Sequence, residues 1–251
     1  MATAVDKALR VLDLLDGAPE GKPLIAISSA ADLPKSTAHR LLQTLVMQGF
    51  AAKTPGGNYR IGPKLIALGA SASQNDYFLV SVRPILRDLM NRCQETVQLG
   101  VLLNEQLLFL ERMSPVNLAV QVGNLPSPLS ELHTSAMGKS ILAAKSPEYV
   151  QSYVQGGLKQ YTVHTITDPP ALLAELEKIR RRGYAVSNEE RHDGVLAVGA
   201  AITNALGDPV AALSVAAPTM RVTDQTVELL AESTLASAAQ ISHLNMLSAG
   251  A

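Results

Sequence analysis

The chain has 251 residues, enough for one or two ordinary domains, and its content of 47% apolar and 17% charged residues excludes a mainly disordered protein. Its net charge of −1 is unevenly distributed, because residues 1–75 have eight basic and five acidic side chains, a net charge of +3, and the remainder has −4. The longest strongly apolar stretch without a charge, residues 195–207, has 13 residues, fewer than the roughly 20 that cross a bilayer. Asp6 and Lys7 interrupt any secretory signal, so we expect a cytoplasmic protein with no membrane partner.

The first part of the chain predicts short elements in a characteristic order. Apolar residues at helical spacing predict a helix over residues 4–16, and a short apolar segment follows at 24–31. Pro34 is placed to begin another helix, which Gly49 ends. Two short strands, 50–54 and 58–61, flank a turn rich in proline and glycine. This order is typical of a winged helix-turn-helix, a DNA-binding module.

Charge supports the same interpretation. Residues 33–75 include five basic side chains and no acidic one, as expected for a surface that faces the phosphates of a polyanion. The nine aromatic residues form no stacking pattern, which favours duplex DNA over single strands. The candidate DNA contacts are the polar residues of the third predicted helix and the hairpin: Lys35, Ser36, Thr37, His39, Arg40, Thr44, Lys53, Asn58, Tyr59 and Arg60.

The rest of the chain predicts an α+β domain. The pattern predicts a helix over residues 63–73 and a domain boundary near 70–78. We therefore expect a winged helix domain at 1–66, a helical linker at 67–78 and a second domain at 79–251. In the second domain the pattern predicts five helices, from Pro84 to Cys93, over 135–145, from Pro147, over 169–182 and over 223–246. It also predicts five strands, over 96–103, 106–113, 118–122, 195–203 and 210–217. Because most strands follow one another as hairpins, the sheet should be largely antiparallel.

The sequence shows no pattern that would support catalysis. The five histidines form no metal-binding or catalytic motif, and we expect no catalytic residue, no metal site and no cofactor. Residues 189–193, Glu-Glu-Arg-His-Asp, could supply a general base or a metal ligand, but a solvated loop is the simpler interpretation. Cys93 is interpreted as a small buried side chain. The small residues of 194–201 and 211–217 fit a ligand pocket or close helix packing equally well.

Several motifs resemble the IclR family of bacterial transcriptional regulators. They are Leu-Pro-Lys-Ser-Thr-Ala-His-Arg-Leu-Leu at 33–42, Tyr-Arg-Ile-Gly-Pro-Lys-Leu at 59–65, Leu-His-Thr-Ser-Ala-Met-Gly-Lys at 132–139, Thr-Ile-Thr-Asp-Pro at 165–169 and Ile-Arg-Arg-Arg-Gly-Tyr at 179–184. The resemblance implies a winged helix domain joined by a helical linker to a GAF-like effector domain, assembled as a homodimer or homotetramer on a pseudo-palindromic operator. Asp32 departs from the glycine usual in the family's turn, although aspartate tolerates a left-handed backbone better than most residues.

The resemblance also implies an effector site. Transferred position by position, the family's pocket consists of Ser135, Ala136, Met137, Ser187, Ala197, Ser214 and Ala216. Ser187, Ala197 and Ala216 stand where members that bind small acids have aspartate, cysteine and serine. Free N–H groups at the start of a helix near Ser135 can hold a carboxylate, and the loss of polar groups favours an effector with more apolar surface than glyoxylate, such as an aromatic or branched acid.

We therefore predict a DNA-binding transcriptional regulator that responds to a small organic acid. Two alternatives are an enzyme with an appended DNA-binding domain, which the missing catalytic motif disfavours, and an architectural DNA binder without a ligand. The second alternative would not need so large an α+β domain.

Overall fold

The structure is a computed structural model that describes residues 3–116, 120–123 and 128–248. The chain divides into two compact units, Met1–Tyr77 and Phe78–Ala251. Each unit has its own hydrophobic core and is described by itself.

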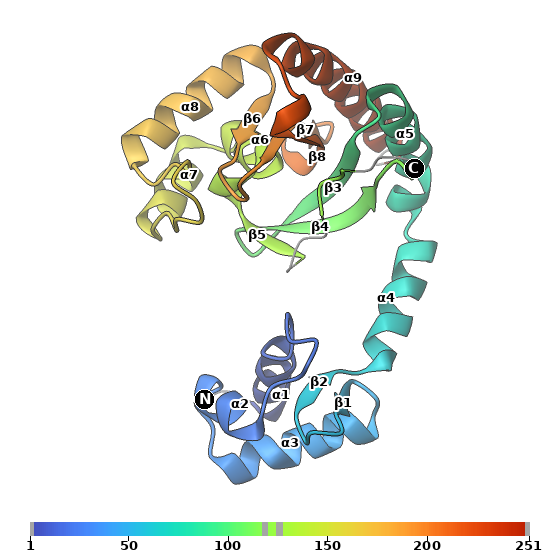
Figure 1. The fold of residues 1–251 in the computed structure, drawn as a ribbon, viewed down its shortest axis with the longest axis vertical. Helices are drawn as coiled ribbons and strands as arrows, with labels where there is room; N and C mark the ends of the chain where they lie inside the picture. The colour runs from blue at the N-terminus through green and yellow to red at the C-terminus, as the bar shows by residue number, and fades with distance from the viewer. Residues whose placement is uncertain (1–2, 117–119, 124–127, 249–251) are drawn as a thin grey trace. The chain divides into compact units, whose positions relative to one another are not determined.

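The first unit is a winged helix-turn-helix, as the sequence predicted (Figure 1). Its elements are α1 (Ala4–Asp13), α2 (Leu24–Ala30), α3 (Lys35–Met47), β1 (Ala51–Lys53), β2 (Tyr59–Ile61) and α4 (Pro63–Asn75). Thr3 and Asp6 form a reciprocal capping box that begins α1, and Pro63 begins α4. The core between the first three helices and the antiparallel hairpin includes Val11, Ile27 and Leu42, all at most 1% exposed.

The second unit contains a six-stranded sheet in the order β5-β4-β3-β8-β7-β6, in which every pair is antiparallel. The strands are β3 (Thr96–Leu103), β4 (Gln106–Met113), β5 (Leu129–Glu131), β6 (Ala185–Asn188), β7 (Val195–Thr203) and β8 (Pro209–Pro218). Asn104 and Glu105 join β3 to β4 with φ angles of 47° and 63°, values that suit a two-residue hairpin turn. The predicted α+β class and antiparallel sheet are confirmed.

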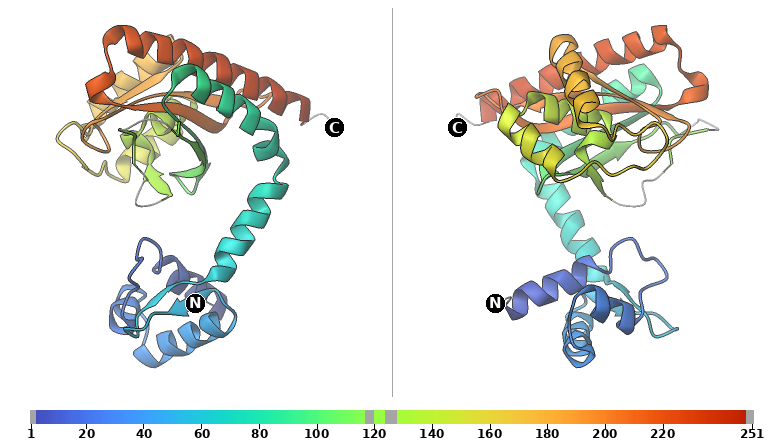
Figure 2. Two further views of the ribbon diagram at one scale, coloured as in Figure 1. Left: turned by 45° about the vertical axis from the view of Figure 1, so that its right-hand side comes forward. Right: turned by 90° about the vertical axis from the view of Figure 1, so that its left-hand side faces the viewer.

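Helices cover both faces of this sheet (Figure 2). On one face α5 (Tyr77–Cys93) and α9 (Asp224–Ser248) pack against the apolar side chains of β3, β7 and β8. On the other face lie α6 (Ala136–Ala144), α7 (Pro147–Gln155) and α8 (Pro169–Arg182), and short 3-10 turns occur at Leu132–Thr134 and Thr219–Arg221. Successive residues of a strand point to opposite faces, so alternate small residues of β7 and β8 face α6. Among the described helices, none is long and apolar enough to cross a membrane.

Three elements differ from the sequence-based prediction. The helix predicted to begin at Pro84 begins at Tyr77, because the buried stripe that includes Leu79 and Val82 sustains it across the exposed proline. The strand predicted over 118–122 is wrong in its second half, since residues 120–122 form no strand, while 118 and 119 lie outside the described residues. The third strand along the chain in this domain is β5, at Leu129–Glu131, in place of the strand predicted over 118–122. The short edge strand β6 was not predicted.

Candidate functional site

A basic, exposed surface extends over α3 and the hairpin of the first unit. All five basic residues of the acid-free segment, Lys35, Arg40, Lys53, Arg60 and Lys64, are exposed. None of them forms an ion pair with a residue that the structure describes. Four of these cations lie on α3 and the hairpin and Lys64 lies at the start of α4, and exposed cations without an acidic ion-pair partner suit a module that binds a polyanion.

The predicted DNA contacts lie on this surface, with one exception. Lys35, Ser36, Arg40, Thr44, Lys53 and Arg60 are exposed, and Thr37, His39 and Asn58 are half-buried. Tyr59 is only 5% exposed and belongs to the core, where the Lys53 ammonium lies 5.7 Å from the centre of its ring. Burial makes Tyr59 a packing residue of the hydrophobic core and not part of the exposed surface.

Asp32 occupies the turn between α2 and α3. Its φ angle is 51°, which is the left-handed conformation that the family's glycine would adopt without strain. The amide of Leu33 donates to the Ser28 carbonyl at 3.0 Å across this turn. The aspartate therefore preserves the turn despite the departure from the family pattern.

The second unit has a pocket between the sheet and the start of α6. Every residue predicted for the effector site lines it: Ser135, Ala136, Met137, Ser187, Ala197, Ser214 and Ala216. The cavity volume is about 60 Å³, several times what one water molecule requires, so a compact molecule can enter. In this pocket Ser187 of β6, Ala197 of β7 and Ser214 and Ala216 of β8 meet the N-terminus of α6.

Local sequence explains how α6 comes so close to the sheet. Ser135 is the N-cap, and its hydroxyl accepts a hydrogen bond from the Gly138 amide at 3.1 Å. A Cβ on Gly199 would lie 2.7 Å from the Ala136 carbonyl carbon and 2.8 Å from the Met137 nitrogen. Glycine at 199 is thus required for the backbone of the helix start to rest on β7, which brings its N–H groups to the pocket.

Two buried polar side chains on the sheet face the pocket without protein partners. Gln98 on β3 and Ser214 on β8 are direct cross-strand neighbours, 6% and 2% exposed. Neither side chain makes a hydrogen bond with any residue that the structure describes. Neither residue contributes to the buried polar atoms that lack a partner in the described chain, so the polar atoms of Gln98 and Ser214 are open to the pocket, where a polar ligand atom can reach them.

The charged cluster at 189–193 is only partly the solvated loop that the sequence predicted, because Asp193 is exposed but Glu190 is buried. Glu190 is 7% exposed, and its Oε1 lies 2.6 Å from the ammonium of Lys139, which is 1% exposed. The same ammonium donates to the Val186 carbonyl at 2.8 Å. Burial raises the pKa of Glu190 in spite of the nearby lysine. Only the fold reveals this pair, because its members are 51 positions apart in the chain.

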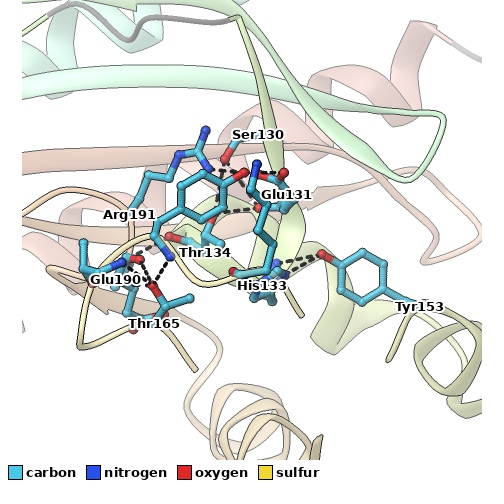
Figure 3. Close-up of polar contacts among 12 residues, drawn as sticks. Ser130, Glu131, His133, Thr134, Tyr153, Thr165, Glu190 and Arg191 are labelled. Carbon is cyan, nitrogen blue, oxygen red and sulfur yellow. Dashed lines mark hydrogen bonds and ion pairs between the residues drawn. The ribbon is translucent and has the colours of Figure 1, made fainter. Parts of the chain in front are cut away.

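Arg191 and His192 line the pocket and were not among the predicted site residues. Arg191 forms an ion pair with Glu131 at 2.9 Å (Figure 3). The guanidinium also lies 3.6 Å from the ring centre of Tyr161, whose hydroxyl donates to Glu131. Burial alone would raise the pKa of Glu131, but the Tyr161 hydroxyl and the Arg191 charge lower it. Glu131 is the last residue of β5, and Arg191 lies in the loop that follows β6. Because β5 and β6 are opposite edges of the sheet, the ion pair between these two residues joins the two edges beside the pocket.

A loop between α7 and α8 supports the same corner. The hydroxyls of Thr162 and Thr165 each donate at 2.6 Å, to the carbonyls of Glu189 and Glu190. These bonds fix the backbone that presents the two pocket residues Arg191 and His192. No local pattern predicts this arrangement, because threonines in a loop are common and their partners lie far away in the chain.

His133 lies near the pocket, fully buried, and serves a structural purpose. Its Nε2 donates to the Lys159 carbonyl at 3.0 Å, which leaves Nδ1 to accept from the Tyr153 hydroxyl at 2.8 Å (Figure 3). Burial lowers the pKa of His133 and raises that of Tyr153 to about 12, so both are neutral near pH 7. Among the residues that the structure describes, no three His, Cys, Asp or Glu side chains gather as metal ligands would.

The fold and these two surfaces define the class: a two-domain DNA-binding transcriptional regulator. Two family models match the chain, "IclR helix-turn-helix domain" over residues 4–55 and "Bacterial transcriptional regulator IclR C-terminal" over 72–243. The chain belongs to the IclR family.

Individual relatives agree along almost the whole length. The HTH-type transcriptional regulator BhcR of Paracoccus denitrificans is 33% identical over 241 residues, covering 95% of this chain and 86% of the relative. The crystal structure of an IclR regulator from Alicyclobacillus acidocaldarius superposes with a TM-score of 0.87 at 26% identity, covering 98% and 99% of the two chains. An IclR homologue from Microbacterium hydrocarbonoxydans, solved with 4-hydroxybenzoate, has a TM-score of 0.75 at 25% identity and covers 96% and 100%.

Proposed function

We propose that this protein controls transcription by binding an operator through α3 and the hairpin, and that a small organic acid in the pocket of the second unit alters this binding. Residues 1–66 would form the DNA-binding domain, 67–78 the linker and 79–251 the effector domain. A homodimer or homotetramer would present two winged helices to a pseudo-palindromic operator in the cytoplasm.

The single observation that supports an effector best is the pair Gln98 and Ser214. Both side chains are buried, face the pocket beside the N-terminus of α6 and lack partners in the described chain. A carboxylate would accept hydrogen bonds from the serine hydroxyl, the glutamine amide and the free N–H groups of the helix, which together would offset its desolvation.

The other pocket walls favour an acid with apolar surface. Phe109, Val122, Leu129, Met137 and Val195 line the pocket. Ala197 and Ala216 contribute methyl groups where the resemblance implies cysteine and serine in members that bind small acids. An aromatic or branched acid would bury more apolar area here than glyoxylate would. The aromatic acid held by the Microbacterium homologue is consistent with this class of effector.

The pocket residues argue against catalysis as the primary function. In the described part of the pocket, the hydroxyls of Ser130, Thr134, Ser135 and Ser187 already hydrogen-bond to neighbouring protein groups. Ser214, the hydroxyl without a partner, makes no hydrogen bond to a histidine or carboxylate that could activate it as a nucleophile.

Calorimetry with glyoxylate and with aromatic and branched acids tests the ligand. We expect saturable binding of an aromatic or branched acid to the wild type, and weaker binding to Ser214→Ala, which removes the hydroxyl and leaves the small-residue packing. Lys178→Ala, on the exposed side of α8, is the control. Tight binding of glyoxylate together with no binding of the larger acids would contradict the proposed effector class.

A further inference from the structure

One wall of the pocket comes from a segment with no regular secondary structure. Residues 120–123 form neither helix nor strand, and Val122 within them lines the pocket. Val122 is only 8% exposed, yet it belongs to neither hydrophobic core of the second unit. Its burial therefore depends on where the segment is held, and its side chain is placed to pack against a molecule in the pocket.

The backbone of this segment is held by side chains and not by other backbone groups. Val120, Val122 and Gly123 make no hydrogen bond to the backbone of any residue that the structure describes. Their carbonyl groups accept instead from two arginines, Val120 from Arg221 and the other two from Arg112. Segments without ladder hydrogen bonds are the least stable parts of a fold, so these contacts decide where the segment lies.

The register of the sheet places Arg112 for this role. Arg112 lies on β4 directly opposite Gln98 of β3, which is itself opposite Ser214 of β8. Opposite residues of neighbouring strands point to the same face, so Arg112 leaves the sheet on the side of the pocket. Its Nη1 donates to the Gly123 carbonyl at 2.6 Å, and its Nη2 donates to the Val122 carbonyl. The guanidinium thus joins the sheet beneath the pocket to the segment that forms one wall.

A guanidinium suits this contact better than an ammonium would. Its planar fork carries donors on separate nitrogens, which reach two successive carbonyls at once. Burial lowers the pKa of Arg112, but an arginine stays protonated near pH 7, so both bonds are charge-assisted. Such bonds are roughly twice as strong as those between neutral groups. Loss of the guanidinium would release the Val122 and Gly123 carbonyls together.

A second arginine holds the other end of the segment. Arg221 donates to the Val120 carbonyl at 2.9 Å. Its guanidinium is oriented by Glu95, because it donates to both carboxylate oxygens, at 2.9 and 2.8 Å. Neither Arg221 nor Glu95 lines the pocket. Arg221 therefore fixes the segment at a distance from the ligand, whereas Arg112 fixes the residue that forms the wall.

We propose that Arg112 is a positioning residue for the effector, because it holds residues 120–123 so that Val122 forms a wall of the binding site. Arg112 acts through the segment and does not itself line the pocket. If the wall is in place for only a fraction of the time, the apparent affinity falls by that fraction. This inference rests on the proposed function, since it concerns the same pocket.

A single tryptophan can report on the segment, because the chain contains none. Val120 is 47% exposed, and Val120→Trp leaves unchanged the backbone carbonyl that Arg221 binds. Time-resolved fluorescence anisotropy should show more fast local motion of this tryptophan in Arg112→Met than with Arg112 intact. Leu206→Trp, at an exposed position between β7 and β8, is the matched control and should not respond to Arg112→Met.

Calorimetry with benzoate, isovalerate and glyoxylate measures the consequence for binding. The acid that binds the wild type most tightly should bind Arg112→Met at least about tenfold more weakly, as expected if the wall is in place about a tenth of the time. Arg112→Lys, which keeps a cation with several donors, should recover part of the loss. Arg180→Met is the control, because Arg180 also donates to a backbone carbonyl, that of Ala143 at 2.8 Å, and does not line the pocket.

A double-mutant cycle separates positioning from the loss of a positive charge near the pocket. Val122→Ala removes most of the wall, so Arg112→Met should weaken binding much less in that background than in the wild type. A pure charge effect would be the same in both backgrounds. Equal effects in the two backgrounds, or wild-type affinity in Arg112→Met, would overturn the inference.

The protein with Arg112 intact decides the matter even if Arg112→Met does not fold. In Val120→Trp alone, a saturating acid should reduce the fast local motion of the tryptophan, because the bound acid packs against Val122. Unchanged motion on saturation would overturn this inference alone. No binding of any of the three acids to the wild type would overturn the proposed function together with it.

Discussion

The buried pair of Lys139 and Glu190 gives the sharpest stability prediction for the second unit. The two side chains are 1% and 9% exposed and 2.6 Å apart, and Glu190 Oε2 is buried without a partner among the described residues. Lys139→Met keeps the aliphatic stem and removes the charge, so a buried carboxylate loses its cation. Breaking a buried pair in this way costs about 3–5 kcal/mol. At about 2–4 °C per kcal/mol for a domain of this size, the melting temperature of the second unit should fall by about 6–20 °C.

The loss should depend on pH with a defined sign. Burial raises the pKa of Glu190 already in the wild type, and removing the lysine should raise it further. A raised pKa means that the folded state binds a proton on Glu190 more readily than the unfolded state does. Protonation of Glu190 therefore stabilises the fold fully at low pH, and this stabilisation is lost as pH rises through the folded-state pKa. The Lys139→Met protein should therefore come closer to wild type at acidic pH than at pH 7.

Differential scanning calorimetry at two pH values measures both effects. Lys178→Met is the control, because Lys178 is 60% exposed and lies 3.6 Å from Glu175, and exposed pairs of this kind contribute about 0–1 kcal/mol. Lys139→Met combined with Glu190→Met should recover most of the lost stability, because no charge remains buried. A Lys139→Met protein no less stable than Lys178→Met would refute the reasoning.

Three further predictions concern the DNA surface, the helix start and the buried histidine. Arg40→Ala should cost about 1–3 kcal/mol on the operator and flatten its sequence preference, while Lys53→Ala should weaken operator and random duplex equally and reduce the salt slope by about one. Fluorescence anisotropy at several salt concentrations separates them, and an equal loss on both duplexes for Arg40→Ala would exclude base contact. Gly199→Ala should destabilise the second unit by about 1–3 kcal/mol and abolish ligand binding, because the new methyl group meets backbone at 2.7 Å; calorimetry showing wild-type affinity would contradict the described approach of α6. Burial lowers the pKa of His133 in the folded state, so as pH falls the unfolded state takes up a proton on this histidine at a higher pH than the folded state does. The free energy of unfolding should therefore decrease as pH drops below about 6.5. Thermal melts of His133→Gln should show a weaker dependence on pH.

Local patterns predicted most of the fold because they depend on neighbours in the chain. Helical spacing, proline at helix starts and glycine at helix ends predicted the order of elements in the winged helix domain, and the Asn104-Glu105 turn predicted the first hairpin of the sheet. The start of α5 was placed wrongly because Pro84, a favourable first residue of a helix, also fits an exposed interior position once packing supplies the stability. Strand β6 has only four residues, too few for a clear alternation of apolar and polar side chains.

The pocket was predicted only in part, and the division has a physical basis. The helix N-terminus near Ser135 and the small residues of β7 and β8 have local signatures, and the family resemblance indicated that they meet. Gln98, Arg191 and His192 have none, because their contribution depends on strand register and on the curl that joins opposite sheet edges. Tyr59 was predicted as a DNA contact from its position in the hairpin, but its ring is part of the core, which depends on packing against residues distant in the chain.

One binding measurement tests the central claim that this protein is an effector-controlled regulator. Fluorescence anisotropy would follow its binding to labelled DNA from upstream of its own gene, with random duplex as competitor, at two salt concentrations, with and without 4-hydroxybenzoate and pooled organic acids. The account predicts binding tighter than to random duplex and a shift in affinity with at least one acid, which Ser214→Ala weakens. Specific binding that no acid alters, in a protein that binds none of them by calorimetry, would contradict the account.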